Sequence, residues 1–185
     1  MTPTELQTLK AAILADPVLN AFPNTADGAF DLAAVLNAPA VPQYDVWNSR
    51  ASVQAVFDAI NWSAYTPTDS PDRTALFTNR LLAIQTKQMN LQNILVGRDT
   101  IDGTKVNVRS GLRDAVVALP SGAGGASTSA GGASGVNVLT QLTRPAKLIE
   151  KILASGTATT GTVTAGLMGR EGTVSYQDVQ AARAA

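Results

Sequence analysis

Apolar side chains recur every three or four positions through most of the first 120 residues, which is the spacing of one face of an amphipathic helix. Each periodic run opens with residues that can cap a helix: Thr2, the segment 24–27, Ser52 and the pair 69–70. Prolines then mark where the first two runs stop. The pattern predicts short helices over residues 3–16, 27–38 and 53–60, followed by a much longer one.

The longest periodic stretch begins at Pro71 and ends before Gly97. Its regular positions alternate by four and three residues: Phe77, Leu81, Ile84, Gln88, Leu91 and Leu95. A helix of about 26 residues, roughly 39 Å long, is predicted. The rest of its surface carries amides and hydroxyls rather than the Glu-Lys pairs of a typical solvated face. Two interpretations are open: this face binds another protein, or it is the exterior of an ordinary core helix.

Turn-forming residues interrupt the helical pattern after the long helix. The pair Asp102-Gly103, between two short alternating segments, predicts a β-hairpin. Ser110 is expected to cap a further helix. Residues 121–135 contain only Gly, Ala, Ser and Thr, which cannot bury enough apolar area to offset the entropy of ordering, so a flexible loop is predicted. Helical periodicity returns over residues 137–156, with a kink or break at Pro145.

The fold class predicted from these elements is mainly α: a helical bundle with one long helix, a minor β-hairpin near residue 102 and a flexible Gly/Ser-rich loop. The bundle is assigned to residues 1–156, including the loop 121–135. One hydrophobic core is expected in a chain of 185 residues. Its predicted members share the apolar faces of the helices: Leu9, Ile13, Leu32, Leu36, Val56, Phe57, Ile60, Leu81, Ile84, Leu112, Val116, Ile149 and Ile152.

Residues 157–185 are predicted to form an extended C-terminal arm with a short terminal helix. The segment up to residue 174 is rich in Thr and Gly and has few large apolar groups to bury, although the alternation around Val163 suits a strand added to another sheet edge. Ser175 caps a short helix that needs a surface to pack on, and Tyr176 and Val179 share one of its sides. We expect Val163, Tyr176 and Val179 to contact a partner; the alternative is that the helix docks on its own bundle.

The net charge and the absence of two residue types exclude several classes of function. Fourteen Lys and Arg balance fourteen Asp and Glu, so no net charge attracts nucleic acid or an anionic membrane. There is no Cys and no His, which excludes the catalytic mechanisms that need them, disulfides and the usual structural zinc sites. No stretch approaches the ~20 apolar residues of a membrane span, and no secretion signal opens the chain. We expect a soluble, non-enzymatic protein with no cofactor, no metal, no membrane partner and no specific nucleic-acid partner.

Two segments invite comparison with ligand sites. The glycines of residues 122–125 could approach a phosphate, but no buried strand precedes them and no Lys follows closely. Asp99, Asp102 and Asn107 could suggest calcium, but their spacing does not fit an EF-hand loop. A flexible loop and a turn explain the two segments better.

Three aromatic residues, Trp47, Trp62 and Tyr65, flank the third predicted helix. They could form a docking patch for another protein, because aromatic side chains are enriched at interfaces. The alternative, that they cover the core formed by the first three helices, is favoured.

Several segments without catalytic character carry a resemblance to a known family. They are residues 15–29, 45–47, 61–62, 107–111 and 170–179. Together, and in this order, they resemble a family of small structural proteins of tailed-bacteriophage virions. The resemblance spreads over most of the chain.

The resemblance implies a head–tail connector, or adaptor, subunit of the virion neck. Such a protein binds copies of itself in a ring, expected to be twelve-fold, and joins the portal protein to the tail or to other neck proteins. It is made in the cytoplasm of the bacterial host. Alternatives are another virion role, such as tail terminator or minor capsid protein, and a small-molecule-binding protein, which a closed polar pocket would indicate.

Overall fold

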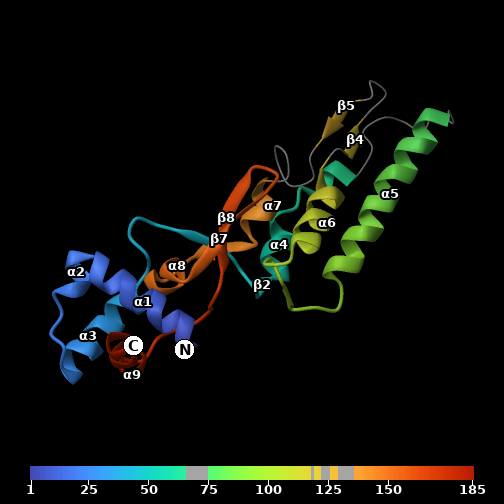
Figure 1. Ribbon diagram of the computed structural model, residues 1–185. Coiled ribbons are helices and arrows are strands. Elements are labelled where there is room, and N and C mark those ends of the chain that lie inside the picture. The colour runs from blue at the N-terminus through green and yellow to red at the C-terminus, as the bar shows by residue number, and fades with distance from the viewer. Residues whose placement is uncertain (66–74, 118, 122–125, 129–135) are drawn as a thin grey trace. The chain divides into compact units, whose positions relative to one another are not determined.

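The computed structural model describes residues 1–65, 75–117, 119–121, 126–128 and 136–185 (Figure 1). Contacts divide the chain into two compact units. The first comprises residues 1–46, 145–158 and 165–185, and the second comprises residues 47–144 and 159–164. Each unit is therefore built from segments that are distant in the sequence.

Helices from both ends of the chain build the first unit: α1 (Pro3–Ala15), α2 (Pro17–Asn20), α3 (Ala26–Asn37), α8 (Leu148–Ile152) and α9 (Tyr176–Ala184). The expected cap of α1 is present, since Glu5 N donates to Thr2 Oγ1 at 3.2 Å and Thr2 N donates to Glu5 Oε2 at 2.7 Å. Helix α9 packs against α1 and α3 (Figure 1). The helices share one core: Leu9, Ile13, Leu19, Ala29, Leu32, Ala33, Leu36, Ile149, Leu153, Val174, Val179 and Ala182.

The second unit contains the helices α4 (Val53–Ala59), α5 (Ala75–Leu95), α6 (Val106–Val116) and α7 (Val136–Thr140), and the 3₁₀ helix η1 (Trp62–Tyr65). Two strand pairs accompany them: β2 (Ala51–Ser52) with β3 (Thr100–Ile101), and β4 (Leu119–Ser121) with β5 (Ala126–Thr128), both antiparallel. Helices α5 and α6 pack against each other (Figure 1). Buried side chains of this unit include Val56, Ile84, Leu91, Leu112, Val116, Leu119, Leu139 and Leu142.

A four-stranded sheet has the order β6-β1-β8-β7. Its strands are β1 (Asp45–Trp47), β6 (Thr143–Pro145), β7 (Ala154–Thr160) and β8 (Val163–Met168). Strands β1 and β8 run parallel, with Val46 opposite Gly166. Gly161 lies between β7 and β8 with a φ of 60°, a conformation that glycine adopts without steric cost.

The prediction of a mainly α bundle is wrong, because the described residues combine helices with this sheet and the two strand pairs. The Thr-rich segment around Val163 is a strand, as its alternation suggests, but it pairs within its own chain. Near Pro145 the structure has a three-residue strand between two five-residue helices. Helices and strands this short contain too few residues for a helical or strand periodicity of apolar positions to be recognised in the sequence.

The predicted β-hairpin near residue 102 is also wrong. Strand β3 pairs with β2, which is about fifty residues earlier in the chain, and not with the residues after Gly103. The Asp-Gly pair does form a turn, in which Asp102 Oδ1 accepts from Thr104 N at 2.9 Å and from Thr104 Oγ1 at 2.6 Å. Helix α6 then begins at Val106, ahead of the Ser110 cap that the sequence suggests.

The predicted boundary between a 1–156 bundle and a 157–185 arm differs from the structural division. Residues after Gly156 supply the end of β7, the whole of β8 and α9, and they are distributed over both units. The predicted single core is divided as well, since Leu9 and Leu36 lie in one unit while Ile84 and Leu112 lie in the other. Phe57, expected in the core, is 46% exposed.

Two further predictions lie partly outside the described residues. The described long helix α5 has 21 residues and begins at Ala75, whereas the predicted helix begins at Pro71, in a segment that is not described. Of the predicted loop 121–135, only Ser121 and residues 126–128 are described, and they belong to the β4–β5 pair.

Candidate interaction surfaces

The second unit has an apolar groove between α4, η1 and α5. Its volume is about 390 Å³, and it is lined by Val53, Phe57, Trp62, Gln88, Leu91, Gln92, Leu95 and Val96. Phe57, Trp62 and Val96 are 46%, 37% and 72% exposed, so water reaches large parts of three apolar side chains. None of the lining side chains is charged. Such a groove suits an apolar segment of a protein rather than a polar small molecule.

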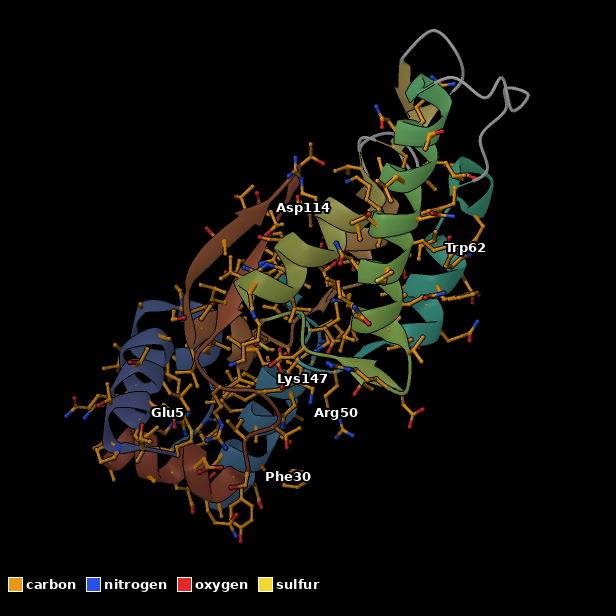
Figure 2. The ribbon with its side chains drawn as sticks, turned by 90° about the vertical axis from the view of Figure 1, so that its right-hand side faces the viewer. Glu5, Phe30, Arg50, Trp62, Asp114 and Lys147 are labelled. Carbon is orange, nitrogen blue, oxygen red and sulfur yellow. The ribbon has the colours of Figure 1, made fainter. Side chains whose placement is uncertain are left out.

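A chain of aromatic contacts fixes the α4 wall of the groove. The rings of Phe57 and Trp62 lie 4.4 Å apart between centroids, and those of Trp62 and Tyr65 lie 5.8 Å apart. Trp62 Nε1 donates to Phe57 O at 3.1 Å, and Tyr65 Oη donates to Ala115 O at 2.7 Å. Burial raises the pKa of Tyr65 to about 12, so the hydroxyl stays protonated as a donor. Figure 2 shows Trp62 at the end of α4, beside α5.

The outer face of α5 forms a second surface, which we call the ridge and define as Leu82, Thr86, Met89 and Asn93. All four side chains are exposed, with Leu82 and Met89 each 61% exposed. Their spacing is four, three and four residues, the repeat of a helix seam that packs on a partner. The ridge lies roughly 180° around the helix from the buried seam that includes Ile84 and Leu91. Helix α5 therefore carries one seam for its own unit and one that the described residues leave exposed.

A buried arginine stabilises the unit that carries both surfaces. Arg109 is 2% exposed; its Nε donates to Thr160 Oγ1 at 3.0 Å, and its Nη1 donates to Gly103 O at 2.8 Å and to Thr104 O at 2.7 Å. The guanidinium carbon lies 4.3 Å from the ring centroid of Trp47, which is fully buried. Burial lowers the pKa of Arg109, which the nearby Asp102 partly offsets. These contacts fasten α6, against which α5 packs.

The first unit also exposes apolar side chains, and it has an open apolar hollow of about 520 Å³ lined by Pro17, Val18, Ala21, Phe22 and Pro23. Leu14, Val18 and Phe30 are 60%, 68% and 66% exposed. Arg183 donates from Nη1 to Pro23 O at 2.6 Å and from Nη2 to Phe22 O at 2.9 Å, which ties α9 to the loop after α2. Figure 2 labels Phe30 on the helix α3.

The partner-contact residues predicted from sequence lie in different settings. Val179 is fully buried in the core of the first unit, so its side chain is not available to a partner. Tyr176 is 39% exposed, and Val163 lies partly buried in β8. Val163 belongs to the second unit, whereas Tyr176 and Val179 belong to the first. Tyr176 and Val163 remain accessible, while the alternative, a terminal helix docked on its own chain, describes α9.

The aromatic residues Trp47, Trp62 and Tyr65 also differ in how far they are buried. Trp47 is buried under Arg109 and Tyr65 is 8% exposed, as core-covering side chains would be. Trp62 alone combines a place in the groove with substantial exposure. The sequence left open whether the amide- and hydroxyl-rich face of the long helix binds another protein, but it did not single out Leu82 and Met89, although these recur seven residues apart.

The segments compared with ligand sites carry no supporting geometry where they are described. Asp102 bonds within its own turn, and Asp99 is exposed to solvent. Across the described residues no group of three or more acidic side chains could hold a metal ion. Residues 122–125 lie outside the described part of the chain. No helix within the described ranges is long and apolar enough to cross a membrane.

The comparison with known proteins identifies no relative of this chain. No family model, no curated protein and no solved structure matches the chain.

Proposed function

We propose that this chain is a structural subunit of a tailed-bacteriophage particle, where copies of it form a ring at the neck and join the portal protein to the tail. The observation that carries the proposal is the outer face of α5. A helix whose exposed side chains are apolar, amide or hydroxyl, beside an open apolar groove, is suited to contact another protein. The resemblance of five segments to virion proteins supplies the biological setting.

The electrostatics of the chain support repeated assembly of identical copies. The formal net charge is zero, with fourteen positive and fourteen negative side chains, so identical subunits do not repel each other at long range. Exposed apolar side chains on each unit, such as Met89 and Phe30, offer separate surfaces for different neighbours. A subunit between a portal and a tail needs contacts to more than one neighbour.

The test is a conditional knock-out of the gene for this chain in the phage that encodes it. A neck connector is required for joining, so the proposal predicts filled heads and free tails that remain separate in electron micrographs. Complementation with the wild-type gene serves as the control and should restore joined particles. Complete, infectious particles assembled without the chain would refute the proposal. Loss of tail length control alone, with heads still joined, would instead indicate a tail terminator.

A further inference from the structure

The ridge and the groove lie on the same unit, and neither contains a charged side chain. The ridge is a convex helical seam of Leu82, Thr86, Met89 and Asn93, and the groove is a concave apolar channel between α4 and α5. Knobs from one helix that enter a hollow beside another helix are the ordinary way in which helices pack. We infer that the ridge of one copy of this chain docks in the groove of the next copy.

Charge favours a second copy as the occupant. Each exposed side chain in the described part of α5 is uncharged: Thr78, Asn79, Leu82, Ala83, Gln85, Thr86, Met89, Asn90, Gln92 and Asn93. The groove lining is uncharged as well. A charged partner segment would lose hydration in the groove without a counter-charge to compensate it. The ridge of an identical chain brings only apolar, hydroxyl and amide groups, and the amides of Gln88, Gln92 and Asn93 can donate and accept across the contact.

The geometry also explains why assembly would continue beyond a pair. Ridge and groove are different surfaces, so a contact between them is heterologous and leaves one free ridge and one free groove on every dimer. Repetition closes into a ring when the rotation per subunit divides a full turn. An α5–α5 contact, in contrast, would use the same surface twice and would stop at a dimer. The inference deepens the self-association in the proposed function and rests on that part alone.

Disulfide cross-linking tests the contact directly, because the chain has no cysteine of its own. Three full-length variants are needed: Met89→Cys in the ridge, Val53→Cys in the groove wall, and Phe30→Cys as a matched exposed apolar control in the first unit. Oxidation of mixed Met89→Cys and Val53→Cys should give covalent dimers. Mixtures that contain Phe30→Cys should give little. Dimers of Met89→Cys alone, in preference to the mixture, would overturn the inference in favour of an α5–α5 pair.

A charge placed on the ridge gives a second measurement. Met89→Glu should weaken self-association at least tenfold in sedimentation velocity, while Phe30→Glu should leave it unchanged. Both side chains are exposed, at 61% and 66%, so neither change should unfold its unit, which circular dichroism checks. A wild-type chain that stays monomeric at its solubility limit would overturn the inference. That result would leave the knock-out test of the neck role standing, so the two failures are distinguishable.

Discussion

Replacement of Arg109 by methionine should unfold the second unit at markedly lower denaturant, because this side chain connects three backbone or hydroxyl acceptors inside the unit. Methionine keeps the apolar stem but removes three hydrogen bonds of 2.7–3.0 Å and the contact 4.3 Å from the Trp47 ring. The lost bonds are worth about 1 kcal/mol each, and the cation–π contact about another 1 kcal/mol. Part of this loss of stability is offset, because methionine removes the cost of burying a charge that is not hydrogen-bonded to a carboxylate.

The net destabilisation is therefore about 3 kcal/mol, which corresponds to a shift of roughly 2 M in the urea midpoint for a unit of this size. Tryptophan fluorescence is a selective assay, since both tryptophans, Trp47 and Trp62, lie in the second unit. Arg113→Met is the matched control: this arginine sits one turn later on α6, its side chain is 44% exposed, and it should cost less than about 0.5 kcal/mol. Equal midpoints for the two variants would refute the role assigned to Arg109.

Three further predictions concern the first unit. Deletion of residues 175–185 removes α9 and its buried Val179, so amide hydrogen exchange across α1 and α3 should accelerate strongly; unchanged protection there would show that these helices fold without α9. Gly28→Ala should destabilise α3 by about 2 kcal/mol despite the better helix propensity of alanine, because the new Cβ would lie 2.1 Å from Pro23 O; a rise in thermal stability would contradict this. Hydrogen bonds from the backbone of their own N-caps lower the pKa values of the Glu5 and Asp178 carboxyls, so their stabilisation is fully present above about pH 5 and is lost progressively as the pH falls below that. An acid titration followed by circular dichroism that lacks a transition in this range, or that shows identical curves for wild type and Glu5→Gln, would count against it.

Much of the local structure could be predicted from the sequence because it depends on neighbouring residues. The caps at Thr2, Ser52 and Ser175 and the periodic faces of α1 and α3 follow from contacts within a few residues. Pairings between distant segments could not be predicted in this way. The partner of β3 lies about fifty residues away, and nothing within the Asp102-Gly103 turn distinguishes a local hairpin from that pairing.

For a related reason, the surface on which the C-terminal helix packs could not be predicted from the sequence. A short helix that cannot stand alone must pack somewhere, and the side chains of Tyr176 and Val179 do not specify where. The matching surface is a property of α1 and α3, which are more than a hundred residues earlier. The candidate surfaces show the same division. The uncharged exterior of α5 is visible in the sequence, whereas the groove exists only after α4 and η1 are placed beside it.

A reconstruction of the assembled neck by electron cryomicroscopy tests the central claim most directly. The account predicts a closed ring of identical copies of this chain between portal and tail, with Met89 of each copy seated beside Trp62 and Val53 of its neighbour. A neck that lacks the chain, or a ring in which the outer face of α5 is left in solvent, would contradict it.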